Sequence, residues 1–82
     1  MKRRLMLNKI LEKITARHEY ALDVRTIDTD RFLHQIDCFH SLDAARMYAN
    51  AHPCTNKNER YSIICIQYDV EDNEIGTYEI KT

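Results

Sequence analysis

Two cysteine–histidine pairs flank one short segment of the chain. One residue separates Cys38 from His40, and one residue separates His52 from Cys54. Thiolates and imidazoles are zinc ligands, two cysteines can form a disulfide, and a thiolate beside an imidazole can act as a nucleophile. Which of these chemistries is available depends on whether the two pairs can meet.

The segment between the pairs predicts a helix over residues 41–52. Ser41 is a favourable N-cap, Asp43 suits the first turn, and Pro53 ends the run. A helix would hold His40 and His52 about 18 Å apart at a rise of 1.5 Å per residue. Zinc ligands must converge within a few ångströms, and a disulfide needs Cα atoms within about 7 Å. We therefore expect no metal site and no Cys38–Cys54 disulfide, unless the helix is broken or a second subunit supplies ligands.

Nucleophilic catalysis has little support from the residue types. No third group is placed to orient a histidine beside Cys38 or Cys54, and the single glycine leaves little freedom for a substrate-binding backbone. Cys65 lies in an apolar run and is expected to be a small core residue. The sequence predicts a protein that is not an enzyme and that needs no cofactor.

Positive charge gathers at the start of the chain, where residues 1–18 hold six basic residues against Glu12, a balance of +5. The basic residues are Lys2, Arg3, Arg4, Lys9, Lys13 and Arg17. Apolar residues recur there at helical spacing, which predicts a basic amphipathic helix over about residues 4–18. Such a helix could lie against nucleic-acid phosphates or a partner, or simply carry a solvated face.

Negative charge gathers near the other end of the chain. Four acidic residues cluster where two strands are expected to turn, namely Asp69, Glu71, Asp72 and Glu74. They lack the alternation and central glycine of an EF-hand calcium loop. The hairpin tip could mimic phosphates and bind a basic protein groove, or it could keep an edge strand soluble.

The remaining patterns place these charges on an α+β domain. Alternation predicts a half-buried strand over residues 20–27, a turn at 28–30 and a second, antiparallel strand over about 31–37. The apolar run YSIICIQYDV predicts a central strand over residues 61–70, and residues 75–82 return as its partner. We expect the order α-β-β-α-β-β: an antiparallel four-stranded sheet with helices packed on one face, in a single domain made of a helix at 1–18 and a ββαββ core at 19–82.

Eighty-two residues with a net charge of -1 fit one small globular domain. The start of the chain lacks the pattern of a signal peptide, and no apolar stretch approaches the roughly 20 residues that span a membrane. We expect a cytoplasmic protein with reduced thiols. A homodimer through the amino-terminal helix would cover its apolar stripe.

In size, and in the run of YALDVRTI, FHSLDAARMYANAH and RYSIICIQYDV, the chain resembles small phage-encoded host-interaction proteins of the anti-CRISPR and defence-inhibitor type. That resemblance implies stoichiometric binding that blocks a bacterial defence complex, such as a nucleic-acid-processing effector, or another host complex. The basic start of the chain departs from the uniformly acidic surface of a DNA mimic. The alternative function is a small nucleic-acid-binding or regulatory protein that uses the basic helix.

Overall fold

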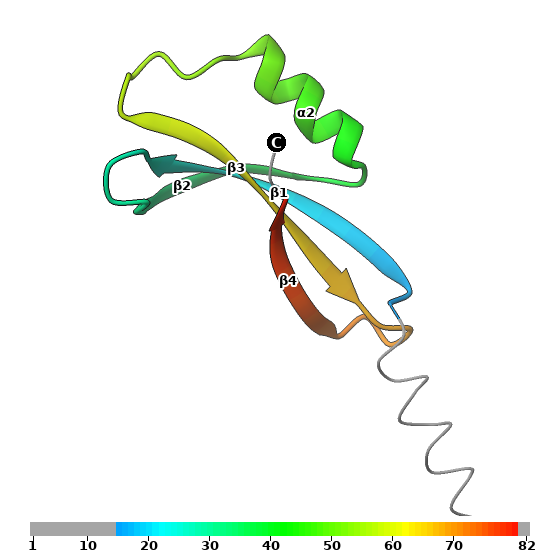
Figure 1. Ribbon diagram of the computed structural model, residues 1–82. Helices are drawn as coiled ribbons and strands as arrows, with labels where there is room; N and C mark the ends of the chain where they lie inside the picture. The colour runs from blue at the N-terminus through cyan, green and yellow to red at the C-terminus, as the bar shows by residue number, and fades with distance from the viewer. Residues whose placement is uncertain (1–14, 81–82) are drawn as a thin grey trace, which may run out of the picture.

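The computed structural model describes residues 15–80, and residues 1–14 and 81–82 lie outside the described part. Four strands form one antiparallel sheet in the order β2-β1-β3-β4, and one helix, α2, lies against one face of it (Figure 1). The elements are β1 (Arg17–Thr26), β2 (Phe32–Phe39), α2 (Leu42–Ala51), β3 (Glu59–Tyr68) and β4 (Glu74–Ile80). Two hairpins are therefore joined through a helix.

The predicted α-β-β-α-β-β arrangement with several helices is wrong. The described structure is 53% strand and 15% helix, with the order β-β-α-β-β and α2 as its one helix. Arg17 and His18, expected to end the first helix, instead begin β1, because β1 pairs with β3 from Arg17 opposite Tyr68 to Thr26 opposite Glu59. The rest of that predicted helix, over residues 4–14, lies outside the described residues.

Strand β1 is more deeply buried than its alternating pattern predicts. It has β2 on one side and β3 on the other, so the four residues from 21 to 24 are buried on both faces. Leu22 is fully buried toward α2, while Asp23, expected on a solvated face, is only 8% exposed. Strand β3 is central as predicted, and Cys65 within it is fully buried.

Helix α2 forms where its capping residues predict it. The Ser41 hydroxyl accepts the N–H of Ala44 at 3.1 Å, Asp43 lies in the first turn, and the helix ends before Pro53. Fully buried Ala45 lets the helix approach the sheet closely, and it packs with Leu22 and Ile63 in the core. The contacts between α2 and the sheet all lie on one face of the sheet (Figure 1). No described element packs over the opposite face.

Candidate functional site

The tip of the β3–β4 hairpin is organised by the side chain of Asp69. Its Oδ1 accepts the backbone N–H groups of Glu71 and Asn73, each at 2.9 Å. The Asp69 N–H donates to the Asn73 carbonyl at 2.9 Å, and the Asp72 N–H donates to the Asp69 carbonyl at 3.1 Å. The hydrogen bonds that the carboxyl accepts, above all that from the Asn73 N–H, lower the pKa of Asp69. The main role of the Asp69 side chain is thus to hold the backbone of the hairpin tip in place.

The residues after Asp69 are the ones that the tip displays. Val70 is 71% exposed, and Glu71, Asp72 and Glu74 are exposed around it. Asp72 has a φ of 69°, in the left-handed region, which the surrounding loop bonds maintain. Val70, predicted as the last residue of the central strand, instead lies in the turn after β3. Its acidic neighbours in the turn were the signal in the sequence that it could be an exposed apex.

Arg17 joins the predicted basic and acidic sites. Its guanidinium lies 2.5 Å from Asp72 Oδ1 and 2.8 Å from Glu19 Oε1, and 3.9 Å from the centre of the Tyr68 ring. The Asp72 carboxylate, followed by that of Glu19, raises the pKa of Arg17. The start of β1 is therefore pinned to the hairpin tip by residues that are 55 positions apart.

The other basic candidates, Lys2, Arg3, Arg4, Lys9 and Lys13, lie outside the described residues. Their predicted arrangement on one helical face, and a homodimer through that helix, stay predictions. Of the six, Arg17 alone is described, and it lies on a strand rather than on a helix.

The two cysteine–histidine pairs lie at opposite ends of α2. The ten helical residues between them span about 15 Å at 1.5 Å per residue. His52 caps the helix by donating its N–H to the Tyr48 carbonyl at 2.9 Å, and the two rings are 4.3 Å apart. Across residues 15–80 no three or more His, Cys, Asp or Glu side chains gather closely enough to hold a metal ion.

Both thiols at the ends of α2 have a raised pKa. For Cys38 the main cause is burial, followed by the carboxylates of Glu19 and Asp37. For Cys54 the causes are burial and the carboxylate of Glu59. A raised pKa keeps a thiol protonated at neutral pH, and the protonated form is a poor nucleophile and a poor metal ligand.

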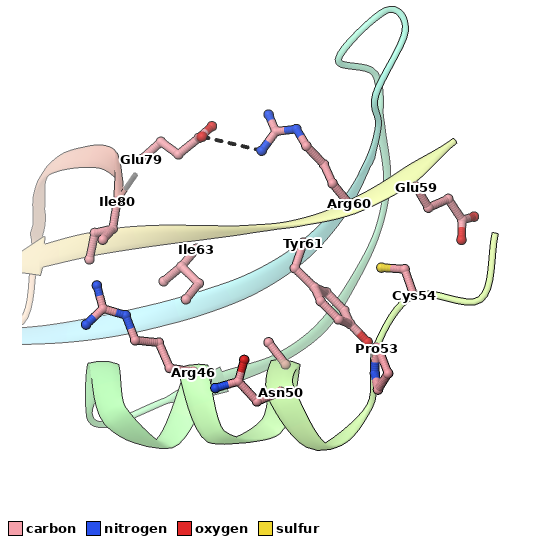
Figure 2. Close-up of a pocket in the computed structure, with 11 residues that line it drawn as sticks. Arg46, Asn50, Pro53, Cys54, Glu59, Arg60, Tyr61, Ile63, Glu79 and Ile80 are labelled. Atoms are coloured by element: carbon pink, nitrogen blue, oxygen red, sulfur yellow. Dashed lines mark ion pairs between the residues drawn. The ribbon is translucent and has the colours of Figure 1, made fainter. Parts of the chain in front are cut away.

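A hollow of about 750 Å³ opens between α2, β3 and the end of β4 (Figure 2). Arg46 and Asn50 line it from α2, and Ile63 and Ile80 supply its apolar part. Arg60 and Glu79 border the hollow, but their side chains project to the side of the sheet away from α2, where Arg60 pairs with Asp30 at 2.5 Å and with Glu79 at 3.5 Å (Figure 2).

The Cys54 thiol lies on the loop side of this hollow, near Tyr61 (Figure 2). The Tyr61 hydroxyl donates to the His52 carbonyl, and burial is the main cause that raises its pKa. The hollow thus combines an apolar floor with two protonated acids, which is the lining of a structural cleft more than of a reaction site.

No protein-family model, curated protein or solved structure matches this chain. No helix in the described part of the chain is both long and apolar enough to cross a membrane.

Proposed function

We propose that the protein is a non-enzymatic binding module that contacts a protein partner through the tip of the β3–β4 hairpin. The observation that carries this proposal is Val70, an apolar side chain 71% exposed at the apex of a loop that Asp69 holds in place. A loop already ordered before binding loses less conformational entropy on association. An exposed apolar apex on such a loop suits insertion into a pocket of a partner.

The charges around Val70 indicate the partner's chemistry. Glu71, Asp72 and Glu74 surround the apex, and Arg17 compensates Asp72 alone among them. The complementary surface is an apolar pocket with a basic rim, which long-range attraction would help the tip to find. This is the contact expected of an acidic hairpin that engages a basic protein groove.

The thiols support a role in binding rather than catalysis. Cys38 and Cys54 have raised pKa values, so neither is activated as a nucleophile. Nucleic-acid binding through the basic residues gains no support from Arg17, because its charge is used by Asp72 and Glu19. The resemblance to small phage-encoded inhibitors directs the search for partners to bacterial defence complexes and other host complexes in the cytoplasm.

The test compares two exposed apolar residues in hairpin turns at opposite ends of the sheet. The immobilised protein, its Val70→Ser variant and its Ile27→Ser variant are each incubated with bacterial lysate, and the bound proteins are quantified by mass spectrometry. Ile27, which is 56% exposed in the β1–β2 turn, is the matched control. We expect at least one protein to bind the wild type and Ile27→Ser equally and to be depleted on Val70→Ser.

A candidate from this comparison is then purified and titrated against the same three proteins. Loss of affinity with Val70→Ser and Glu71→Lys, at unchanged thermal stability, supports the hairpin tip as the contact. If no captured protein depends on Val70, or if the purified candidate binds Val70→Ser as well as the wild type, the proposal is wrong.

A further inference from the structure

The hollow between α2 and β3 is open because two neighbouring elements leave it uncovered. Strand β4 ends at Ile80, opposite Ile63, so residues 59–62 of β3 have β1 on one side and no described strand on the other. Helix α2 packs mainly over β1 and β2. A hollow of about 750 Å³ is therefore left between the free side of α2 and the start of β3 (Figure 2).

The floor of the hollow is apolar. Ile63 of β3 and Ile80 of β4 lie opposite each other in the sheet and point toward the helix, and Ala49 lines the hollow from α2. The side chain of Tyr61 continues this floor toward the loop after α2 (Figure 2). Pockets that bind small molecules have such volumes, and most are lined by apolar side chains with a few polar groups that orient the ligand.

The polar groups at the floor come from one side of α2. Arg46 and Asn50 are four residues apart, so they are neighbours on the helix surface, and both side chains reach toward the strands (Figure 2). None of the ion pairs among residues 15–80 involves Arg46, although Asp43 precedes it by three residues on the helix. The Arg46 guanidinium is therefore available to an anion, and the Asn50 amide is a second donor beside it.

The acidic residues around the hollow do not neutralise Arg46. Glu79 projects to the other side of the sheet, where it pairs with Arg60 at 3.5 Å. Glu59 lies at the opposite end of the hollow from Arg46, close to Cys54 (Figure 2). The hollow is thus positive at its Arg46 end, and the apolar floor begins next to that charge.

We infer that this hollow binds a small amphipathic carboxylate, with its charged group at Arg46 and Asn50 and its apolar part against Ile63 and Ile80. A guanidinium matches a carboxylate with two parallel hydrogen bonds, and burial of the apolar part on the floor adds to affinity. A phosphate monoester carries nearly two charges and would need a second cation, but Arg60 points away from the hollow. One unpaired arginine therefore favours a carboxylate.

This site goes beyond the proposed function and does not depend on it. The hairpin tip follows the end of β3, whereas the hollow lies at the start of the same ten-residue strand (Figure 1). The two sites are therefore separated by about 30 Å at 3.3 Å per residue. A ligand in the hollow leaves Val70 exposed, so either proposal can fail while the other holds.

The first test uses octanoate, which has one carboxylate and an apolar chain, and octanol, which has the same chain without the charge. The full chain is isotope-labelled and titrated with each compound at neutral pH and fixed salt, and backbone amide signals are followed by NMR. We expect octanoate to cause saturable shifts at Arg46, Asn50, Tyr61 and Ile63, and none at Glu71 in the hairpin tip. Octanol should cause weaker changes at the same residues, because it cannot pair with the guanidinium.

The second test removes the charge that holds the carboxylate. Arg46→Gln should weaken octanoate binding about tenfold, the value of one charge-assisted hydrogen bond, and leave octanol binding unchanged. Arg31→Gln makes the same change at an exposed arginine that does not line the hollow, and should bind octanoate as the wild type does. Arg46→Lys keeps the charge without the planar fork, and should lose only part of the affinity.

The amide spectrum of each variant without ligand establishes that it is folded. The inference is overturned if octanoate causes no saturable shift at the lining residues. Because the full chain is used, this outcome includes the case in which Lys81 and Thr82, which follow Ile80, occupy the hollow. It is also overturned if octanol binds as tightly as octanoate, or if Arg46→Gln binds octanoate like the wild type, because either result means that Arg46 does not hold the carboxylate.

Discussion

The two faces of the central strand pair are buried to a similar degree by different means. Leu22 and Ile63 lie opposite each other toward α2, where they pack with Ala45 in an apolar core. Asp23 and Ser62 follow Leu22 and precede Ile63, and they lie opposite each other on the face away from α2, called the open face below. There Asp23 Oδ1 and Ser62 Oγ have no hydrogen-bond partner among the described residues. Burial therefore has opposite effects on the two faces. On the face toward α2 it removes apolar side chains from water and stabilises the fold, whereas on the open face it leaves polar atoms without hydrogen bonds and costs free energy.

The largest expected loss of stability comes from a substitution in the core on the face that α2 covers. Leu22→Ala removes a fully buried side chain and should lower the free energy of unfolding by about 2–5 kcal/mol. Ile64→Ala, at a half-buried position on the face opposite α2, should cost clearly less. Urea denaturation at low protein concentration measures both values. Equal losses would mean that the two faces are packed alike, which would contradict the comparison.

A smaller loss of stability is expected from a substitution at the N-cap of α2, the helix that covers this face. Ser41→Ala removes the hydroxyl that accepts the Ala44 N–H, and should cost about 1 kcal/mol, as N-cap substitutions usually do. Ser41→Asp keeps an acceptor at the cap and serves as the control, with stability close to that of the wild type. A loss of the same size with Ser41→Asp would show that the hydroxyl acts other than as a cap.

The open face should instead respond to pH. Burial raises the pKa of the Asp23 carboxyl, and Arg25 opposes this only in part. The folded chain then binds a proton at Asp23 more tightly than the unfolded chain does, so this group's contribution to stability falls as pH rises through its folded pKa. Asp23→Asn removes that dependence and should gain stability relative to the wild type as pH rises from acid to neutral.

Urea denaturation of the wild type and of Asp23→Asn tests this pH dependence. Denaturation of both proteins at each pH, at low concentration, gives the difference directly. A difference between wild type and Asp23→Asn that does not change with pH would show that Asp23 is not held in the environment described.

Local sequence patterns predicted much of the structure on the face that α2 covers and little of that on the open face. The Ser41 cap, the Pro53 stop and the alternation of β1 depend on neighbours in the sequence, so α2 and both hairpins were predicted close to their places. The burial of Asp23 depends instead on the order of the strands in the sheet, because β1 has β2 on one side and β3 on the other. The approach of Arg17 to Asp72 joins distant positions, and no spacing rule finds such a contact.

The smallest expected effect concerns the ion pairs at the edge of the open face. Arg17 and Asp72 are both substantially exposed, so solvent and salt screen their attraction and the pair adds little to global stability. Arg17→Ala should therefore leave the unfolding midpoint nearly unchanged. Its effect should be local, because Arg17 also contacts Glu19 and the Tyr68 ring at the base of the hairpin.

Hydrogen exchange would measure that local effect. Amides of the hairpin tip, such as those of Glu71 and Asn73, should exchange faster in Arg17→Ala, whereas the amides of Leu22 and Ile63 should not change. Arg17→Lys keeps the charge but loses the planar contact with Tyr68, and should restore protection only in part. Faster exchange across both central strands would mean instead that this exposed pair supports the whole sheet, and that the two faces depend on each other more than their contacts indicate.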